Sequence, residues 1–138
     1  MKSKLLIAGT CVLTVSLVVL IIIITRTANY IDTSFTKEIS LKYHYGDKEI
    51  DVIITDENDI RVIKENLKGV SYKDNPSCGF SLDISITFSG EEKSLVLCPA
   101  CDSCSTARIG DSSKYVSIKN REELEAVLEK YGFSFPWL

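Results

Sequence analysis

The sequence predicts an α+β protein in which an N-terminal transmembrane helix, over about residues 5–25, precedes a two-layer domain. We expect that domain to hold an antiparallel sheet of about five strands, in the order strand, strand, helix, strand, strand, strand, helix, with both helices on one face. Three observations predict this fold. One long apolar run carries no charge, several later segments alternate apolar and polar residues between short turns, and two segments place apolar residues at helical spacing.

The apolar run has the length of a membrane span. Its 21 residues, 5–25, rise roughly 30 Å at about 1.5 Å per residue, which matches the hydrocarbon core of a bilayer. A cleaved signal peptide is the alternative, but its apolar region is usually about 7–15 residues long, and no small-residue cleavage site follows this run. A lipid-attachment site at Cys11 is also disfavoured, because Cys11 is better explained as a small apolar residue within the helix.

Basic residues beside the apolar run predict its orientation. Lys2 and Lys4 precede the run, and only one basic residue follows it closely, so the positive-inside rule places the N-terminus in the cytoplasm. We therefore expect a single-pass protein of the cell membrane, with an anchor at residues 1–26, a linker at 27–35 and an extracytoplasmic domain at 36–138.

The part after the run has the length of one domain and is acidic. Three of the sixteen basic residues lie in the first 26 residues, which leaves thirteen basic against nineteen acidic residues and a net charge of −6. This charge argues against binding to nucleic acid and against lying flat on an anionic lipid surface.

The predicted strands follow from alternation. Residues 36–45 alternate apolar and polar side chains, Gly46-Asp47 suits a two-residue hairpin turn, and the alternation continues over residues 50–54, so an antiparallel pair is expected. The same period of two predicts three later strands, at residues 82–88, 93–97 and 114–118.

Two helices are predicted from capping and spacing. The first covers about residues 57–68, after a run of capping and acidic residues, and Gly69 follows as a stop. The second begins after Asn120, which with Glu123 has the form of a capping box, and it ends at Gly132. Phe133, Phe135 and Trp137 follow that helix. We interpret these rings as docking on the core, and an exposed partner-binding tail is the alternative.

Four cysteines lie beyond the apolar run: Cys78, Cys98, Cys101 and Cys104. Outside the cell an even number of cysteines indicates disulfides, here two, with three possible connectivities. The loop that holds Cys78 and the cysteine-rich loop should leave the same end of the sheet, so we expect Cys78 to pair with Cys98 or Cys104. Closing such a loop would stabilise the fold by roughly 3 kcal/mol.

Two other interpretations of the same cysteines stay open. Four thiolates could bind zinc tetrahedrally, and two or three could bind copper(I). An iron–sulfur cluster is disfavoured because Arg108 stands where the ferredoxin pattern has its fourth cysteine. Thiol–disulfide exchange at Cys98-Pro99-Ala100-Cys101 is the third interpretation, although no helical pattern follows Cys101 to lower a thiol pKa.

No other catalytic group is evident in the sequence. His44 is the only histidine, and the alternation places it on the solvated side of its strand. No glycine-rich phosphate loop occurs, and nothing brings a nucleophile to His44. We therefore expect a protein that is not an enzyme and that needs no cofactor.

A resemblance concerns the C-terminal part of the chain. The residues that carry it are Asp102-x-Cys104, Lys114-Tyr115-x-x-Ile118, Arg121-Glu122-x-Leu124 and Lys130-Tyr131-Gly132-x-x-Phe135-Pro136. In these the chain resembles small uncharacterised single-pass membrane-anchored proteins of Gram-positive bacteria. The resemblance implies an extracytoplasmic protein and no known activity or site.

These observations together favour a membrane-anchored, extracytoplasmic binding or interaction module, stabilised by disulfides and with an unknown ligand. A zinc- or copper-binding protein and a membrane-tethered thiol oxidoreductase are the alternatives. The expected partners are the membrane, through the N-terminal helix, and another protein.

Overall fold

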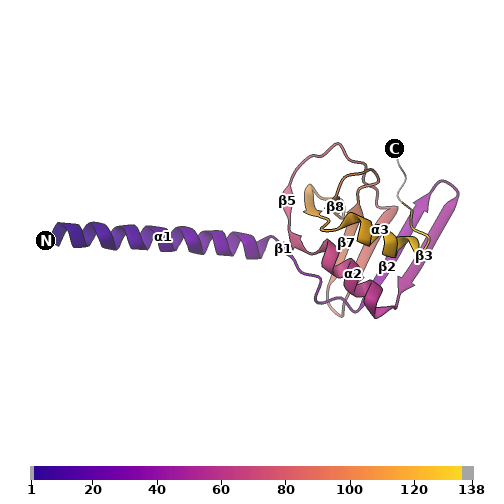
Figure 1. The fold of residues 1–138 in the computed structure, drawn as a ribbon, viewed down its shortest axis with the longest axis horizontal. Helices are drawn as coiled ribbons and strands as arrows, with labels where there is room; N and C mark the ends of the chain where they lie inside the picture. The colour runs from indigo at the N-terminus through magenta and orange to yellow at the C-terminus, as the bar shows by residue number, and fades with distance from the viewer. Residues whose placement is uncertain (1, 135–138) are drawn as a thin grey trace. The chain divides into compact units, whose positions relative to one another are not determined.

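The computed structural model describes residues 2–134, with side chains at residues 12–25 and 29–134. The chain divides into two compact units, Met1–Tyr30 and Ile31–Leu138. Helix α1 (Lys2–Ala28) makes up nearly all of the first unit. The second unit contains the sheet and the other two helices, and Figure 1 shows how these are layered.

The prediction of a transmembrane helix over residues 5–25 is wrong. None of the helices in the described residues has both the length and the apolar character that a membrane span requires. The single-pass membrane location, the cytoplasmic N-terminus and the extracytoplasmic placement of the domain depended on that helix and are corrected with it.

The second unit is built on a seven-stranded antiparallel sheet with the order β3-β2-β6-β7-β8-β9-β5. Its strands are β2 (Glu38–Tyr45), β3 (Lys48–Ile54), β5 (Tyr72–Lys73), β6 (Ile84–Ser89), β7 (Ser94–Pro99), β8 (Thr106–Ile109) and β9 (Lys114–Ser117). Two further short strands, β1 (Tyr30–Ile31) and β4 (Gly69–Val70), form a separate two-stranded sheet. The sheet thus has seven strands where about five were expected. The two that were not predicted are β5, which has only two residues, and β8, where adjacent buried residues Thr106 and Ala107 replace an alternation.

Both helices of this unit begin at side-chain caps. Asp56 accepts hydrogen bonds from the backbone N–H groups of Asn58 and Asp59 at the start of α2 (Glu57–Leu67). Asn120 accepts from the N–H of Glu123 at the start of α3 (Arg121–Glu129). The predicted capping box is only half right, because the Asn66 side chain accepts from the Asn120 N–H (2.8 Å) and donates to Glu123 (2.9 Å). The α3 cap therefore ties this helix to α2.

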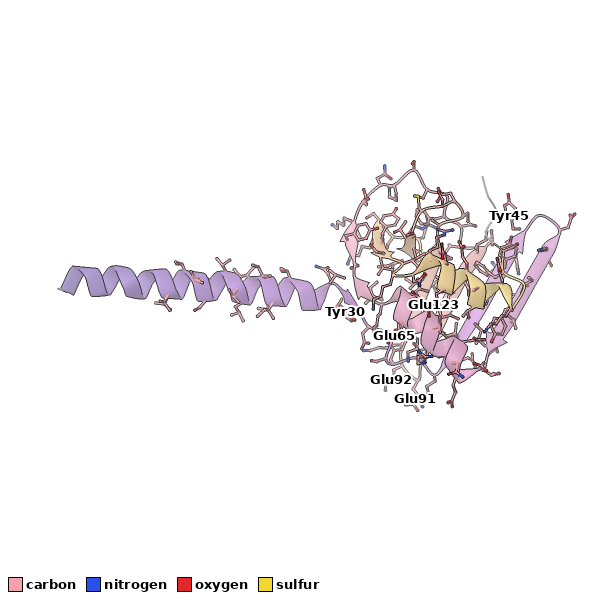
Figure 2. The ribbon with its side chains drawn as sticks, in the orientation of Figure 1. Tyr30, Tyr45, Glu65, Glu91, Glu92 and Glu123 are labelled. Atoms are coloured by element: carbon pink, nitrogen blue, oxygen red, sulfur yellow. A yellow bond between two sulfur atoms is a disulfide. The ribbon has the colours of Figure 1, made fainter. Side chains whose placement is uncertain are left out.

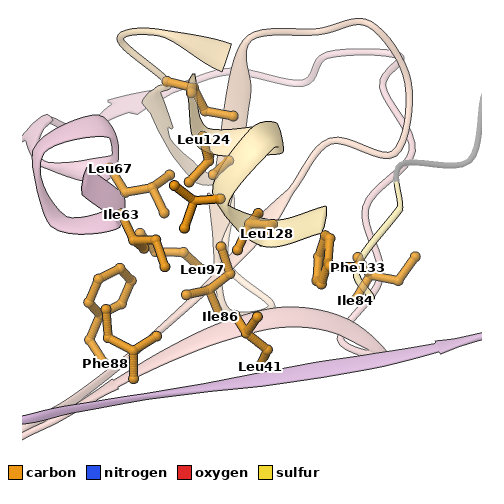
Figure 3. Close-up of a cluster of buried hydrophobic side chains, with 14 of the residues drawn as sticks. Leu41, Ile63, Leu67, Ile84, Ile86, Phe88, Leu97, Leu124, Leu128 and Phe133 are labelled. Atoms are coloured by element: carbon orange, nitrogen blue, oxygen red, sulfur yellow. The ribbon is translucent and has the colours of Figure 1, made fainter. Parts of the chain in front are cut away.

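Helices α2 and α3 cover one face of the sheet, and the core lies between the two layers (Figures 1 and 3). Fully buried side chains come from both helices and from β2, β6 and β7: Leu41, Ile63, Leu67, Ile84, Ile86, Phe88, Leu97, Leu124 and Leu128. Phe133 is also fully buried, with its ring centroid 5.0 Å from that of Tyr43. Of the predicted aromatic tail, Phe133 thus docks on the core, whereas Phe135 and Trp137 lie outside the described residues.

A buried carboxylate joins the two helices at one end. Asp59, in α2, accepts hydrogen bonds from Lys130 Nζ (2.7 Å) and Tyr131 Oη (2.8 Å), which follow α3. The bond from Lys130 is the main cause that lowers the pKa of Asp59, and burial raises the pKa of Tyr131 to about 12.

Candidate functional site

The outer face of the sheet, opposite the helices, is covered at its β7–β8–β9 end by the loop of residues 74–83. Strand register places Cys98 beside Arg108, and Arg108 beside Tyr115, on this face. Phe80 of the loop packs its ring 5.3 Å from the Tyr115 ring, and the Arg108 guanidinium lies 5.8 Å from the centroid of the Phe80 ring. This layer leaves Cys98 with no exposed surface.

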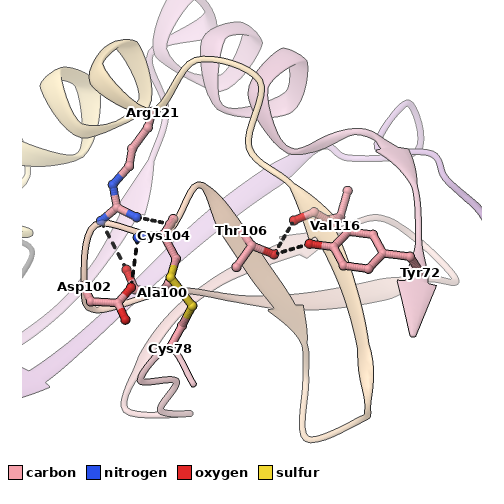
Figure 4. The surroundings of a disulfide bond; sticks show 8 residues. All are labelled: Tyr72, Cys78, Ala100, Asp102, Cys104, Thr106, Val116 and Arg121. Carbon is pink, nitrogen blue, oxygen red and sulfur yellow. Dashed lines mark hydrogen bonds between the residues drawn. A yellow bond between two sulfur atoms is a disulfide. The ribbon is translucent and has the colours of Figure 1, made fainter. Parts of the chain in front are cut away.

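A disulfide between Cys78 and Cys104 joins this covering loop to the loop of residues 100–105 (Figure 4). Two other sets of contacts hold the same loops. The Cys101 N–H donates to the Gly79 carbonyl at 2.8 Å. The guanidinium of Arg121, from α3, donates to the carbonyls of Cys104 and Ala100. Both disulfide cysteines stay half-exposed.

Cys98 and Cys101 are free, so among the described cysteines the second predicted disulfide does not form. The reason is geometric. Cys98 lies on the outer face beside Arg108, whereas Cys101 packs into the core between the sheet and the helices. Burial raises the pKa of both thiols, which keeps them protonated and weakly nucleophilic near neutral pH.

The surroundings of Cys98 and Cys101 do not favour thiol exchange. Cys98 and Pro99 end β7, and the chain then makes a loop to β8 rather than a helix. A helix N-terminus after the first cysteine is what lowers the thiol pKa in redox motifs of this type.

The structure also separates the four cysteines that a zinc or copper site would have used. In the part of the chain with described side chains, the one group of three possible ligands within 4.8 Å of one another is Cys78, Asp102 and Cys104. Asp102 was not identified from the sequence as a possible metal ligand, although its position two residues before Cys104 was a usable signal. Its Oδ1 accepts a hydrogen bond from the Cys104 N–H at 2.9 Å.

His44 lies on the outer face of β2 near the other end of the sheet. Its Nε2 lies 2.8 Å from Asp51 Oδ2, and its side chain is 31% exposed. No nucleophilic hydroxyl or thiol is among the hydrogen-bond partners that the described structure gives it.

Strand β3 forms an edge of the sheet, which sequence reasoning did not identify. The His44 N–H donates to the Asp83 carbonyl at 2.8 Å, so the backbone polar groups of His44 point away from β3. Because hydrogen-bonded and non-hydrogen-bonded pairs alternate along an antiparallel ladder, the register leaves the N–H and C=O groups of Glu49, Asp51 and Ile53 pointing outward from the sheet. No strand among the described residues pairs with that side of β3.

Comparisons with known proteins give no assignment for this geometry. The sequence matches no protein-family model, and searches of curated proteins and of solved structures find no similar protein. The resemblance to Gram-positive membrane-anchored proteins stays a prediction.

Proposed function

We propose that residues 31–138 form a non-catalytic binding module that takes an extended segment of a partner protein as an added strand along β3. The observation that carries this proposal is the row of outward backbone groups at Glu49, Asp51 and Ile53. An extended segment can satisfy these donors and acceptors by strand addition. The exposed side chain of Ile53, 54% accessible, offers it an apolar contact.

The other edge of the sheet is a poorer site for strand addition. Strand β5 has two residues, against seven in β3, so it offers too few backbone groups to fix the register of a bound segment. The disulfide and the covering loop lie at the β7–β8–β9 end, the opposite end of the sheet from β3. In this proposal the disulfide stabilises the module and takes no part in binding.

The charge of the edge favours a basic partner segment. Glu49 and Asp51 place two exposed carboxylates on the outer side of β3, so Lys or Arg at the facing positions of an incoming strand would pair with them. The same carboxylates would repel each other if two copies of β3 paired. Further acidic side chains, Glu65, Glu91, Glu92 and Glu123, lie on the surface of this unit (Figure 2) and would attract a basic segment at longer range.

The side chains on the helix-facing side of β3 favour apolar residues at the facing positions of the partner segment. Val52 points to this side and is only partly buried against the core. An apolar residue in the incoming strand would cover it. The best partner segment therefore alternates basic residues, facing Glu49 and Asp51, with apolar residues that extend the core.

A peptide with this pattern tests the proposal on the full-length chain. The probe is an alternating Val-Lys peptide of about nine residues, near the upper length of ordinary strands, and its control is the matching Val-Glu peptide. Asp51→Pro removes one outward N–H without removing a bond to β2, and Asp51→Ala removes the same side chain but keeps that N–H.

Strand addition requires the proline variant to bind the Val-Lys peptide at least about tenfold more weakly than the alanine variant, as expected for the loss of roughly one hydrogen bond. Equal affinities for the two variants would show charge attraction without strand pairing and would overturn the proposal. So would equal binding of the Val-Glu peptide, or a wild-type dimer that Asp51→Pro dissociates.

A further inference from the structure

We propose that Cys78, Cys104 and Asp102 form a zinc site once the Cys78–Cys104 disulfide is reduced. The ligand atoms of these three residues lie within 4.8 Å of one another, and each residue is half-buried. Two thiolates and a carboxylate are ordinary zinc ligands. The partial exposure of all three leaves a fourth position open to water or to an external ligand.

The dimensions of a zinc site suit this cluster. Zinc binds thiolate sulfur at about 2.3 Å and carboxylate oxygen at about 2.0–2.2 Å, so neighbouring ligand atoms in a tetrahedral site lie roughly 3.5–3.8 Å apart. The two sulfurs are 2.07 Å apart in the disulfide, so after reduction they must separate by roughly 1.5–1.7 Å to reach this spacing. The Asp102 carboxylate already lies within 4.8 Å of both, and side-chain rotation of the two freed cysteines would bring all three ligand atoms onto one ion.

Contacts other than the disulfide keep the two loops in place after reduction. The Cys101 N–H donates to the carbonyl of Gly79, next to Cys78, at 2.8 Å. Phe80 stays packed on Tyr115. Arg121, with a side chain only 12% exposed, donates to the carbonyls of Ala100 and Cys104 (Figure 4), which fixes the shape of the second loop.

The carboxylate of Asp102 is also oriented in advance. Its Oδ1 accepts the Cys104 N–H at 2.9 Å, which holds the carboxylate beside the Cys104 sulfur. A hydrogen bond of this kind to a ligating carboxylate is common in metal sites and raises affinity. Its second oxygen, Oδ2, is the natural zinc ligand.

The chemistry balances with a dithiol as reductant. The dithiol transfers two electrons and two protons to the Cys78–Cys104 bond, which becomes two thiols, and the dithiol itself closes to a disulfide. Binding of Zn²⁺ then releases the two thiol protons to solvent as the sulfurs become thiolates. The oxidised protein has no free thiolate in this cluster, so the redox state of Cys78 and Cys104 decides whether zinc binds.

Cys98 and Cys101 take no part in this site. Cys98 is sealed beneath the covering loop, and Cys101 packs in the core. A double variant, Cys98→Ala/Cys101→Ala, therefore separates the proposed site from one that uses all four thiols.

The test titrates Zn²⁺ into full-length protein reduced anaerobically with a dithiol, which is then removed, in competition with a chromophoric chelator. Asp102→Asn is the ligand variant and Ser103→Ala the neighbouring control. We expect the reduced wild-type chain to bind one zinc ion and the oxidised chain to bind none. Binding should be at least about tenfold weaker in Asp102→Asn. It should be unchanged in Ser103→Ala and in the Cys98→Ala/Cys101→Ala variant. Near-UV circular dichroism of the reduced protein should show native packing when zinc is bound.

Several results would overturn the proposal. One is equal zinc affinity in Asp102→Asn and wild type, and another is zinc binding by the oxidised chain. The others are loss of zinc binding when Cys98 and Cys101 are replaced, and zinc binding by a reduced protein that lacks native near-UV circular dichroism. Cobalt(II) gives a second readout, since sulfur-to-cobalt charge-transfer absorption should appear with reduced wild type and be absent in Cys78→Ala/Cys104→Ala.

Discussion

The disulfide gives the most quantitative expectation for stability. Cys78 and Cys104 lie 26 residues apart in the sequence. In the chain-entropy model a closed loop of this size lowers the free energy of the folded state relative to the unfolded state by about 3.5 kcal/mol at 25 °C. Both cysteines are half-exposed, so their replacement by alanine removes little buried packing.

The perturbation is the double substitution Cys78→Ala/Cys104→Ala, and the assay is urea unfolding followed by circular dichroism in the presence of a metal chelator. We expect the free energy of unfolding to fall by about 3–4 kcal/mol, and the slope against urea to rise because the unfolded chain expands. Wild-type protein under a reductant and chelator is the control and should match the variant. A loss below about 1 kcal/mol would refute the loop-closure reasoning and would mean that the contacts of Gly79, Phe80 and Arg121 alone hold the two loops.

Three further expectations follow from single residues. Phe133→Ala should lower the free energy of unfolding by about 3–5 kcal/mol, because a fully buried ring is removed; a loss like that of a surface substitution would contradict its place in the core. The hydrogen bond from Lys130 lowers the pKa of Asp59 in the folded protein. This bond therefore stabilises the fold at pH values above the unfolded-state pKa of about 3.9, and the stabilisation is lost as the pH falls through the lower pKa of Asp59 in the folded state. Asp59→Asn should therefore reduce the loss of stability on acidification in urea titrations across that range, and an unchanged pH profile would count against the pair. Burial and a raised pKa should make Cys98 and Cys101 react slowly with iodoacetamide in the native protein and quickly after unfolding, as read by mass spectrometry; fast native labelling would show that the loop of residues 74–83 opens.

The sequence predicted correctly those elements whose defining residues all lie next to one another in the chain. The hairpin of β2 and β3 follows from alternation around Gly46-Asp47, and α2 was expected at 57–68 and spans Glu57–Leu67. The α3 cap was predicted only in part, because Asn66, 54 residues from Asn120, completes it. The span predicted from hydropathy over residues 5–25 is not among the helices of the described residues that could cross a membrane.

The candidate sites depend on register and strand order, which local patterns do not encode. Cys78 was expected to pair with Cys98 or Cys104, but the choice depends on Cys98 facing Arg108 beneath Phe80. The involvement of Asp102 appears only once the disulfide fixes the two loops together. That β3 is an edge follows from the pairing of β2 with β6, about forty residues later in the chain.

Amide hydrogen exchange of the full-length chain, with and without the Val-Lys peptide, tests the binding proposal most directly. In the free protein the N–H groups of Ile50 and Val52 should exchange slowly because they bond to β2, whereas those of Glu49, Asp51 and Ile53 should exchange quickly. We expect the peptide to slow exchange at Glu49, Asp51 and Ile53 selectively. Unchanged rates at these three amides in a saturated complex, or slow exchange there before peptide is added, would contradict strand addition at β3.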